Sequence, residues 1–241
     1  MKKKVAIALV TLMAAAAVAQ KKDEKSWTDW SKKDAEKILS DSPWAKTQTD
    51  TDTSEMFFTP GSGGPDVGRN SPGNREFHGA TNQAVNVQFV VRLFSARPVR
   101  QALARLIEIN NKPPADVIAK LHSFAEMQST NSIIVTVTFD STDQRYQREV
   151  MQAFNSAVTS TLKNDAYLQR SDGKQLFLEE YVPPGKDGFG ARFIFLREVD
   201  GQPFVKDATG ELHFYAKYPE GIKVDRRFKL SEMMYQGQLE L

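Results

Sequence analysis

The residues best suited to hold an anionic ligand lie close together in the first half of the chain. Arg97, Gln101 and Arg105 recur every four residues, which places them on one face of a helix, with Arg92 and Arg100 nearby. Guanidinium groups bind carboxylates and phosphates through paired, charge-assisted hydrogen bonds. The alternative is a solvated helix face whose charges pair with acidic residues elsewhere, and we favour it. Arg97, Arg100 and Arg105 are the candidate ligand-binding cations.

The three tryptophans of the chain, Trp27, Trp30 and Trp44, bracket one short segment. Three aromatic side chains so close in sequence are suited to form a platform on which sugars stack. A tryptophan also buries a large area, so the same spacing suits residues that clamp a helix onto a sheet. We favour the clamp and keep Trp27 and Trp30 as candidate ligand-binding residues.

The sequence predicts neither a metal nor another cofactor. Its three histidines, His78, His122 and His213, are far apart, and no HExxH motif occurs. A zinc site would therefore need ligands that converge from distant segments.

The sequence also predicts no catalytic residue. Ser160-Thr-Leu-Lys163 matches the SxxK pattern of penicillin-recognising serine enzymes, but it falls at the end of an expected helix rather than at its start. Glu179 and Glu180 are adjacent on an expected strand, so they point to opposite faces and cannot act as a pair. A hydrolase whose acids converge from separate elements is the alternative that one sequence cannot reveal.

The first 19 residues have the pattern of a secretory signal peptide. Lys2, Lys3 and Lys4 precede an apolar run, and Ala17-Val18-Ala19 fits the small-x-small cleavage rule. We expect cleavage after Ala19 and a periplasmic or secreted protein. Nothing after residue 19 is long and apolar enough to span a membrane.

The charge balance gives no reason to expect a nucleic-acid partner. The formal net charge is +2, from 32 basic and 30 acidic residues, and without the three lysines of the signal peptide 29 basic residues face 30 acidic ones. There is no cysteine, so disulfides and thiol chemistry are excluded. We expect the partner to be an unidentified envelope component or another protein.

Hydrophobic periodicity predicts the elements that must position these residues. Apolar residues alternate over residues 85–94 and 131–140, which predicts two strands. Helical spacing predicts helices from Pro98 to about residue 109, over 115–127 and over 144–162. Ser31 with Asp34 resembles a capping box and predicts a helix that ends before Pro43.

The stretch from Tyr167 to Leu230 predicts an antiparallel meander. Asp172-Gly173, Asp187-Gly188 and Asp200-Gly201 each supply the turn chemistry of a tight hairpin. Two sets alternate on one face of their strands and need a partner layer: Phe189, Ala191, Phe193 and Phe195, then Leu212, Phe214, Ala216 and Tyr218. The fold class that follows is α+β, with a mainly antiparallel sheet and helices packed on one face.

The predicted organisation has four parts. Residues 1–19 are the signal peptide, 20–45 hold the helix bracketed by tryptophans, and 81–241 form the α+β core domain. Residues 46–80 are rich in Gly, Pro and Ser and are expected to be a flexible loop.

Two segments resemble a family of uncharacterised secreted bacterial proteins. They are Trp30-Ser-Lys-Lys-Asp-Ala-Glu-Lys-Ile-Leu-Ser-Asp-Ser-Pro-Trp44-Ala and Ser95-Ala-Arg-Pro-Val-Arg-Gln-Ala-Leu103. The resemblance implies export but brings no catalytic residue and no ligand. The expectation is therefore an exported, non-catalytic binding or structural protein of the cell envelope, with an exported hydrolase as the alternative.

Overall fold

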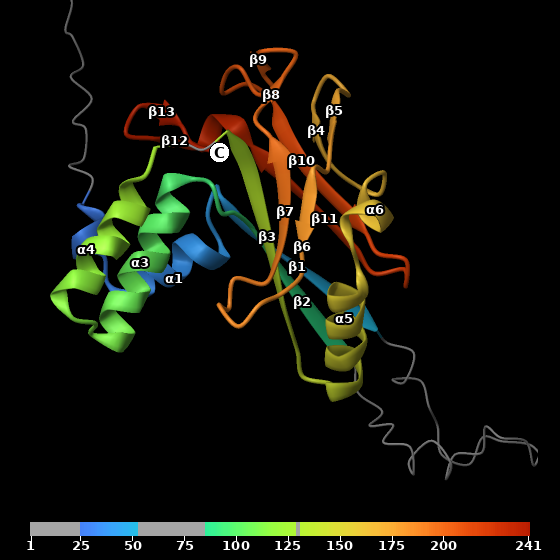
Figure 1. Ribbon diagram of the computed structural model, residues 1–241, viewed down its shortest axis with the longest axis horizontal. Helices are drawn as coiled ribbons and strands as arrows, with labels where there is room; N and C mark the ends of the chain where they lie inside the picture. Colours follow the sequence, from blue (N-terminus) through green and yellow to red (C-terminus); the bar gives the residue numbers. More distant parts are fainter. Residues whose placement is uncertain (1–24, 53–84, 129–130) are drawn as a thin grey trace, which may run out of the picture.

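Alternating apolar residues assemble the chain into two antiparallel sheets with helices beside them (Figure 1). The computed structural model describes residues 25–52, 85–128 and 131–241. The predicted signal peptide and most of the predicted loop lie outside these residues. The α+β class with mainly antiparallel strands is confirmed.

The first sheet, sheet A, contains the two strands with the clearest periodicity. β2 (Val85–Leu93) pairs with β1 (Ala45–Asp52) on one side and with β3 (Ser132–Ser141) on the other. β7 (Ala191–Leu196) and β6 (Glu180–Val182) complete the order β1-β2-β3-β7-β6. Every pair is antiparallel, and the alternating apolar side chains of β2, β3 and β7 are buried on one face.

The second sheet, sheet B, is made from the rest of the C-terminal meander. β4 (Ala166–Arg170), β5 (Gln175–Phe177), β10 (Glu211–Lys217) and β11 (Lys223–Lys229) form the order β11-β10-β4-β5. The meander therefore contributes to both sheets rather than to one.

The inner faces of the two sheets pack against each other. The ring of Phe193 in β7 meets the ring of Phe214 in β10 edge to face, with 5.1 Å between their centroids. The chain passes from sheet B to sheet A at residues 178–179, where Leu178 N–H donates to Ala166 and Glu179 N–H donates to Ile194. Each sheet is thus the partner layer that the other requires.

A buried glutamine joins the opposite edges of the sheets. The Gln48 amide on β1 donates to the Lys223 carbonyl at 2.8 Å and accepts from the Asp225 N–H at 2.8 Å. The Gln48 side chain therefore makes two hydrogen bonds to the backbone of β11, of the kind that a neighbouring strand would make. Because both backbone groups are satisfied, this seam avoids the cost of unpaired polar groups.

One group of helices packs around the tryptophans. It comprises η1 (Trp27–Asp29), α1 (Lys32–Ser40), α3 (Arg97–Asn111) and α4 (Ala115–Glu126). The capping box that begins α1 is confirmed, since Ser31 accepts from the Asp34 N–H and Asp34 accepts from the Ser31 N–H.

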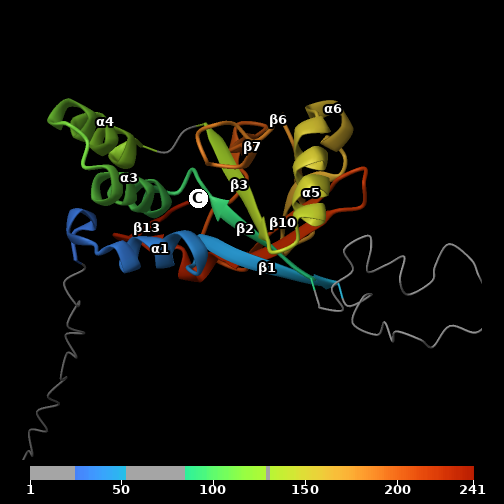
Figure 2. The same ribbon diagram turned by 90° about the horizontal axis from the view of Figure 1, so that it is seen from below.

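A second group of helices, α5 (Gln144–Ser156) and α6 (Thr159–Leu162), lies at the opposite end of the strands (Figures 1 and 2). The single helix predicted over 144–162 is wrong, because Ala157 and Val158 are extended. The break is stabilised by tertiary contacts: Thr159 accepts from the Tyr181 N–H, and the Phe154 carbonyl accepts from the Tyr181 hydroxyl.

The three predicted Asp-Gly pairs all lie in turns, but only Asp200-Gly201 is a two-residue hairpin loop; Asp172-Gly173 lies in the longer β4–β5 loop, and Asp187-Gly188 lies in the long connection between β6 and β7. Gly173, Gly188 and Gly201 all have positive φ, and Asp200 joins Gly201 in the left-handed region, as a tight hairpin turn requires. The Asp200-Gly201 turn connects β8 (Glu198–Val199) to β9 (Gln202–Pro203). The chain ends with η2 (Leu230–Glu232) and the hairpin of β12 (Met234–Tyr235) and β13 (Gln238–Leu239).

Two details of the prediction need correction. Residues 46–52, expected in the loop, belong to β1 and pair with β2 along its whole length. The strand was missed because Lys-Thr-Gln-Thr-Asp-Thr-Asp carries no apolar alternation. Phe189 also lies outside β7, where it packs on Phe94 with 5.1 Å between ring centroids.

Among the described residues, no helix has the length and apolar character required to cross a membrane.

Candidate functional site

The structure directs the predicted cations of α3 toward internal partners. The Arg97 guanidinium pairs with the Glu240 carboxylate at 2.9 Å, and its backbone N–H donates to the other carboxylate oxygen at 3.1 Å. The same guanidinium lies 5.4 Å from the ring centroid of Tyr235. Arg97 therefore binds the final residues of the chain to the start of α3.

Arg100 is buried beside this pair. Its guanidinium donates to the carbonyls of Ser95 and Met127, and burial lowers its pKa. Arg105 donates to the Trp30 carbonyl at 2.8 Å and pairs with Glu108 at 3.1 Å. These contacts connect α3 to neighbouring segments.

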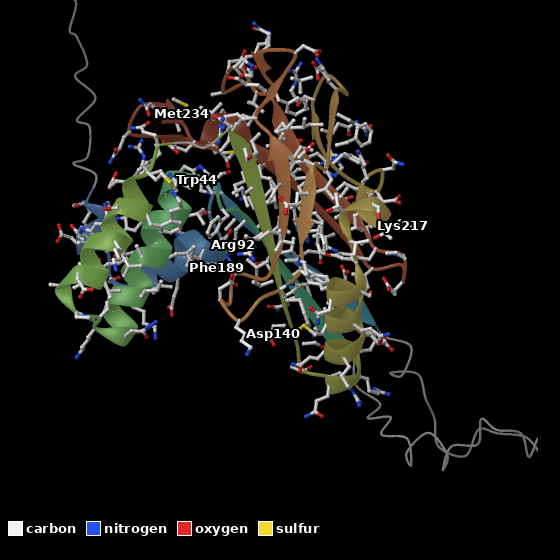
Figure 3. The ribbon with its side chains drawn as sticks, in the orientation of Figure 1. Trp44, Arg92, Asp140, Phe189, Lys217 and Met234 are labelled. Atoms are coloured by element: carbon white, nitrogen blue, oxygen red, sulfur yellow. The ribbon has the colours of Figure 1, made fainter. Side chains whose placement is uncertain are left out.

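Arg92 serves a similar role between sheet A and α1 (Figure 3). Its Nε donates to the Leu39 carbonyl at 2.6 Å, and one Nη donates to the Thr138 hydroxyl at 2.8 Å. Burial lowers its pKa to about 10.

The tryptophans form a clamp rather than an open platform. Trp27, Trp30 and Trp44 are all buried, with at most 9% of each residue exposed. The indole of Trp27 donates to Glu126 at 2.6 Å, and that of Trp44 donates to the Glu240 carbonyl at 3.0 Å. The rings of Trp27 and Trp30 are therefore packed inside the protein rather than laid open side by side.

The outer face of sheet B has a different character. The strand registers place its outward side chains in rows that cross all four strands, from β5 to β11. One row is Gln175, Gln169, His213 and Arg227, and the next is Phe177, Tyr167, Tyr215 and Asp225.

A third row holds two lysines, Lys217 and Lys223, directly opposite each other on β10 and β11. Figure 3 places Lys217 on the far side of the strands from Trp44. We call the side chains of these three rows the sheet B platform.

The aromatic row contains one stacked pair of rings and one edge-to-face pair. The rings of Tyr167 and Tyr215 are nearly parallel with centroids 5.0 Å apart, and the ammonium group of Lys223 lies 5.1 Å from the Tyr215 centroid. Phe177 meets Tyr167 edge to face and is 47% exposed. Desolvation and the neighbouring Tyr215 raise the pKa of Tyr167, so its hydroxyl is protonated at neutral pH.

A histidine–aspartate pair lies beside these rings. His213 Nε2 and Asp225 Oδ1 are 2.7 Å apart, and Lys223 pairs with the other Asp225 oxygen at 3.1 Å. Burial alone would raise the pKa of Asp225, but the hydrogen bonds from His213 and Lys223 lower it. The carboxylate is therefore an acceptor, and His213 Nε2 is the donor.

This pair is poorly arranged for catalysis. A general base must reach the proton that it removes. His213 Nε2 is occupied by Asp225, while Nδ1 is fully buried and makes no hydrogen bond. His122, the other described histidine, lies 2.7 Å from Glu108, which also binds Arg105.

One hollow adjoins the platform at the β4–β5 turn, and a second lies on the other side of that turn's first residues. The first has a volume of about 140 Å³ and is lined by Gln169, Arg170, Ser171, Gly173, Glu211, His213 and Arg227. The second, of about 250 Å³, lies against Arg170 to Asp172 and the 205–210 segment. Both are open, and the walls of the first are mainly polar, which suits recognition of a hydrophilic ligand.

No group of three or more His, Asp or Glu side chains is placed to hold a metal ion within the described ranges. His78, one of the three histidines, lies outside those ranges.

Comparisons with protein-family models, with curated proteins and with solved structures find no match.

Sequence reasoning did not identify the sheet B platform, although a signal was present. The outward positions of β10 and β11 are all polar or aromatic, in strict alternation with buried apolar residues on β10. The alternation of polar and apolar residues predicted only which side chains face the core. Which polar positions of separate strands become neighbours depends on strand order and register, and neither is written in the local pattern.

Proposed function

We propose that this chain is an exported protein of the bacterial envelope, periplasmic or secreted, that binds an envelope component without catalysing a reaction. The observation that supports binding is the sheet B platform. It gathers phenol, amide and cationic groups on one uncovered face beside a polar hollow at the β4–β5 turn. Export is supported by the signal-peptide pattern of residues 1–19.

The geometry of His213 does not favour a histidine base on this face. Its two ring nitrogens are occupied or buried, so the platform offers a ligand hydrogen bonds but no accessible imidazole base. The alternative, an exported hydrolase, gains no support from the described residues.

Co-sedimentation with the isolated envelope fraction of the host tests the binding. The purified full chain is compared with the double variant Gln175→Ala/Arg227→Ala, which alters exposed platform residues, and with Lys33→Ala on α1 as control. We expect the envelope to retain the full chain and the control but not the platform variant. Equal retention of all three, or no retention of any, would contradict the proposal.

Fractionation of the host tests localisation. The mature chain is expected outside the cytoplasm with its first residue at Gln20. Recovery of the processed or unprocessed chain only in the cytoplasm would overturn export.

A further inference from the structure

Building on the proposed binding function, we infer that the sheet B platform recognises an acidic polysaccharide. In this arrangement Lys217 and Lys223 face the acidic groups of the glycan. The hydroxyls of the glycan bond to the tyrosine and glutamine side chains of the two neighbouring rows.

The first argument is an unbalanced charge on the platform. Lys217 and Lys223 are directly opposed on neighbouring strands, where like charges destabilise a sheet. Lys223 is partly compensated by Asp225 at 3.1 Å. Lys217 is exposed and has no ion-pair partner among the described residues. An anionic ligand group placed over the two ammonium groups removes the repulsion.

Further cations lie along β11, in exposed ion pairs. Arg227 and Lys229 continue the cationic series, and their acidic partners, Glu211 at 3.7 Å and Glu232 at 3.5 Å, are exposed pairs. Exposed pairs of this kind are weak and are readily exchanged for a ligand. A ligand that carries repeated negative charges therefore matches the platform better than a neutral one.

The second argument concerns hydrogen bonding. Sugar hydroxyls both donate and accept, and the phenols of Tyr167 and Tyr215 and the amides of Gln169 and Gln175 do the same. These four side chains are adjacent through the registers of β4, β5 and β10. Recognition of an inorganic anion alone would not require side chains that both donate and accept hydrogen bonds.

The third argument distinguishes a glycan from a peptide. An extended peptide binds a sheet by adding a strand to a free edge. β4 and β10, which carry the centre of the platform, are interior strands whose backbone groups are paired on both sides. Recognition there must use side chains that stand on the face of the sheet.

The platform is also long enough for several sugar units. Three inter-strand spacings of about 4.8 Å separate Phe177 from Asp225, a span of roughly 14 Å. At one end of this row Phe177 supplies a half-exposed apolar ring, which suits the C–H surface of a pyranose.

Titration with polygalacturonate, a linear polymer of uronic acid, tests the inference, with dextran as the neutral polymer. The full chain is expected to bind polygalacturonate, with an affinity that falls as salt is added, and not to bind dextran. The double variant Lys217→Gln/Lys223→Gln is expected to lose at least tenfold in affinity. The matched variant Lys33→Gln/Lys120→Gln removes the same charge from α1 and α4 and is expected to bind like the unmodified chain.

Two outcomes would overturn the inference: no binding of polygalacturonate by the unmodified chain, or equal losses in the two double variants. Unchanged unfolding midpoints in both variants would show that any loss is local. If the envelope fraction retains the chain through the platform while polygalacturonate does not bind, the acidic glycan is wrong and the proposed function stands.

Discussion

The arginines of α3 and the cations of sheet B differ in what surrounds them. Arg97 and Arg105 reach carboxylates and carbonyls supplied by segments far away in the chain. Lys217 lies on an open sheet face and meets another lysine across the strands. The arginines of the helix therefore join elements together. On the sheet, Lys217 has no ion-pair partner among the described residues, and the ion pairs of its neighbours are exposed.

The geometry of each element explains this difference. A helix in the middle of a packed group is surrounded by neighbours, and α3 contacts η1, α1 and α4. Its long side chains therefore find partners on several sides. A strand sends alternate side chains to opposite faces, so one half of its residues stays outside the core. A cationic cluster on a strand is consequently a stronger indication of a binding surface than the same cluster on a central helix.

Glu240→Ala should produce the largest effect, because it removes the carboxylate that balances Arg97. Breaking a buried pair by removing one partner leaves the other charge uncompensated, and Arg100 and Arg197 both lie within electrostatic reach of Glu240. We expect a loss of about 3–5 kcal/mol in the free energy of unfolding, measured in urea. Glu232→Ala, which removes an exposed partner of Lys229, should cost less than about 1 kcal/mol. Equal losses in the two variants would contradict the difference between the buried and the exposed ion pair.

A smaller effect is expected when single cations of the two regions are compared. Arg105→Gln removes the hydrogen bond to the Trp30 carbonyl and the pair with Glu108, so the free energy of unfolding should fall by about 1–2 kcal/mol. Lys217→Gln relieves the repulsion with Lys223 and should change stability by less than about 0.5 kcal/mol, in the stabilising direction. A marked destabilisation by Lys217→Gln would show that sheet B also uses its cations internally.

The smallest effect concerns pH and Asp225. Its folded-state pKa is lowered, so the pair with His213 and Lys223 stabilises the fold above the ordinary aspartate pKa of about 4 and is lost as the pH falls below it. Because the side chain is 36% exposed, solvent screening should limit the contribution to a few tenths of a kcal/mol. Unfolding midpoints of Asp225→Asn and the unmodified chain should differ at pH 7, and the difference should shrink as the pH falls below about 4. A difference that stays as large at low pH would assign the effect to shape rather than to charge.

Local sequence signals predicted the strands and helices whose own residues carry a regular apolar spacing or a local capping motif. The strands at 85–94 and 131–140 were found because apolar residues alternate, and the helix after Ser31 because its capping box is local. The same reasoning missed β1, whose residues are polar and which exists because β2 offers a partner along its length. It also missed the break after Ser156, which depends on Tyr181 from a distant strand.

The surroundings of the candidate ligand-binding residues could not be predicted from the local sequence. Arg97, Arg100 and Arg105 were rightly placed on one helix, and Trp27 and Trp30 beside another, but whether they face solvent or a partner depends on the whole fold. The structure gives each of these arginines an internal partner and buries both tryptophans. Whether any of them also binds a ligand stays a prediction.

The sequence by itself determined the fold class, the Asp-Gly turns and the inward face of each strong strand, because periodicity and turn chemistry act over a few neighbouring residues. Only the tertiary structure decided that the meander divides between two sheets, that Gln48 joins their edges, and that two lysines from different strands lie opposite each other. Strand order and register are set by packing summed over the whole chain, and no short segment carries that information.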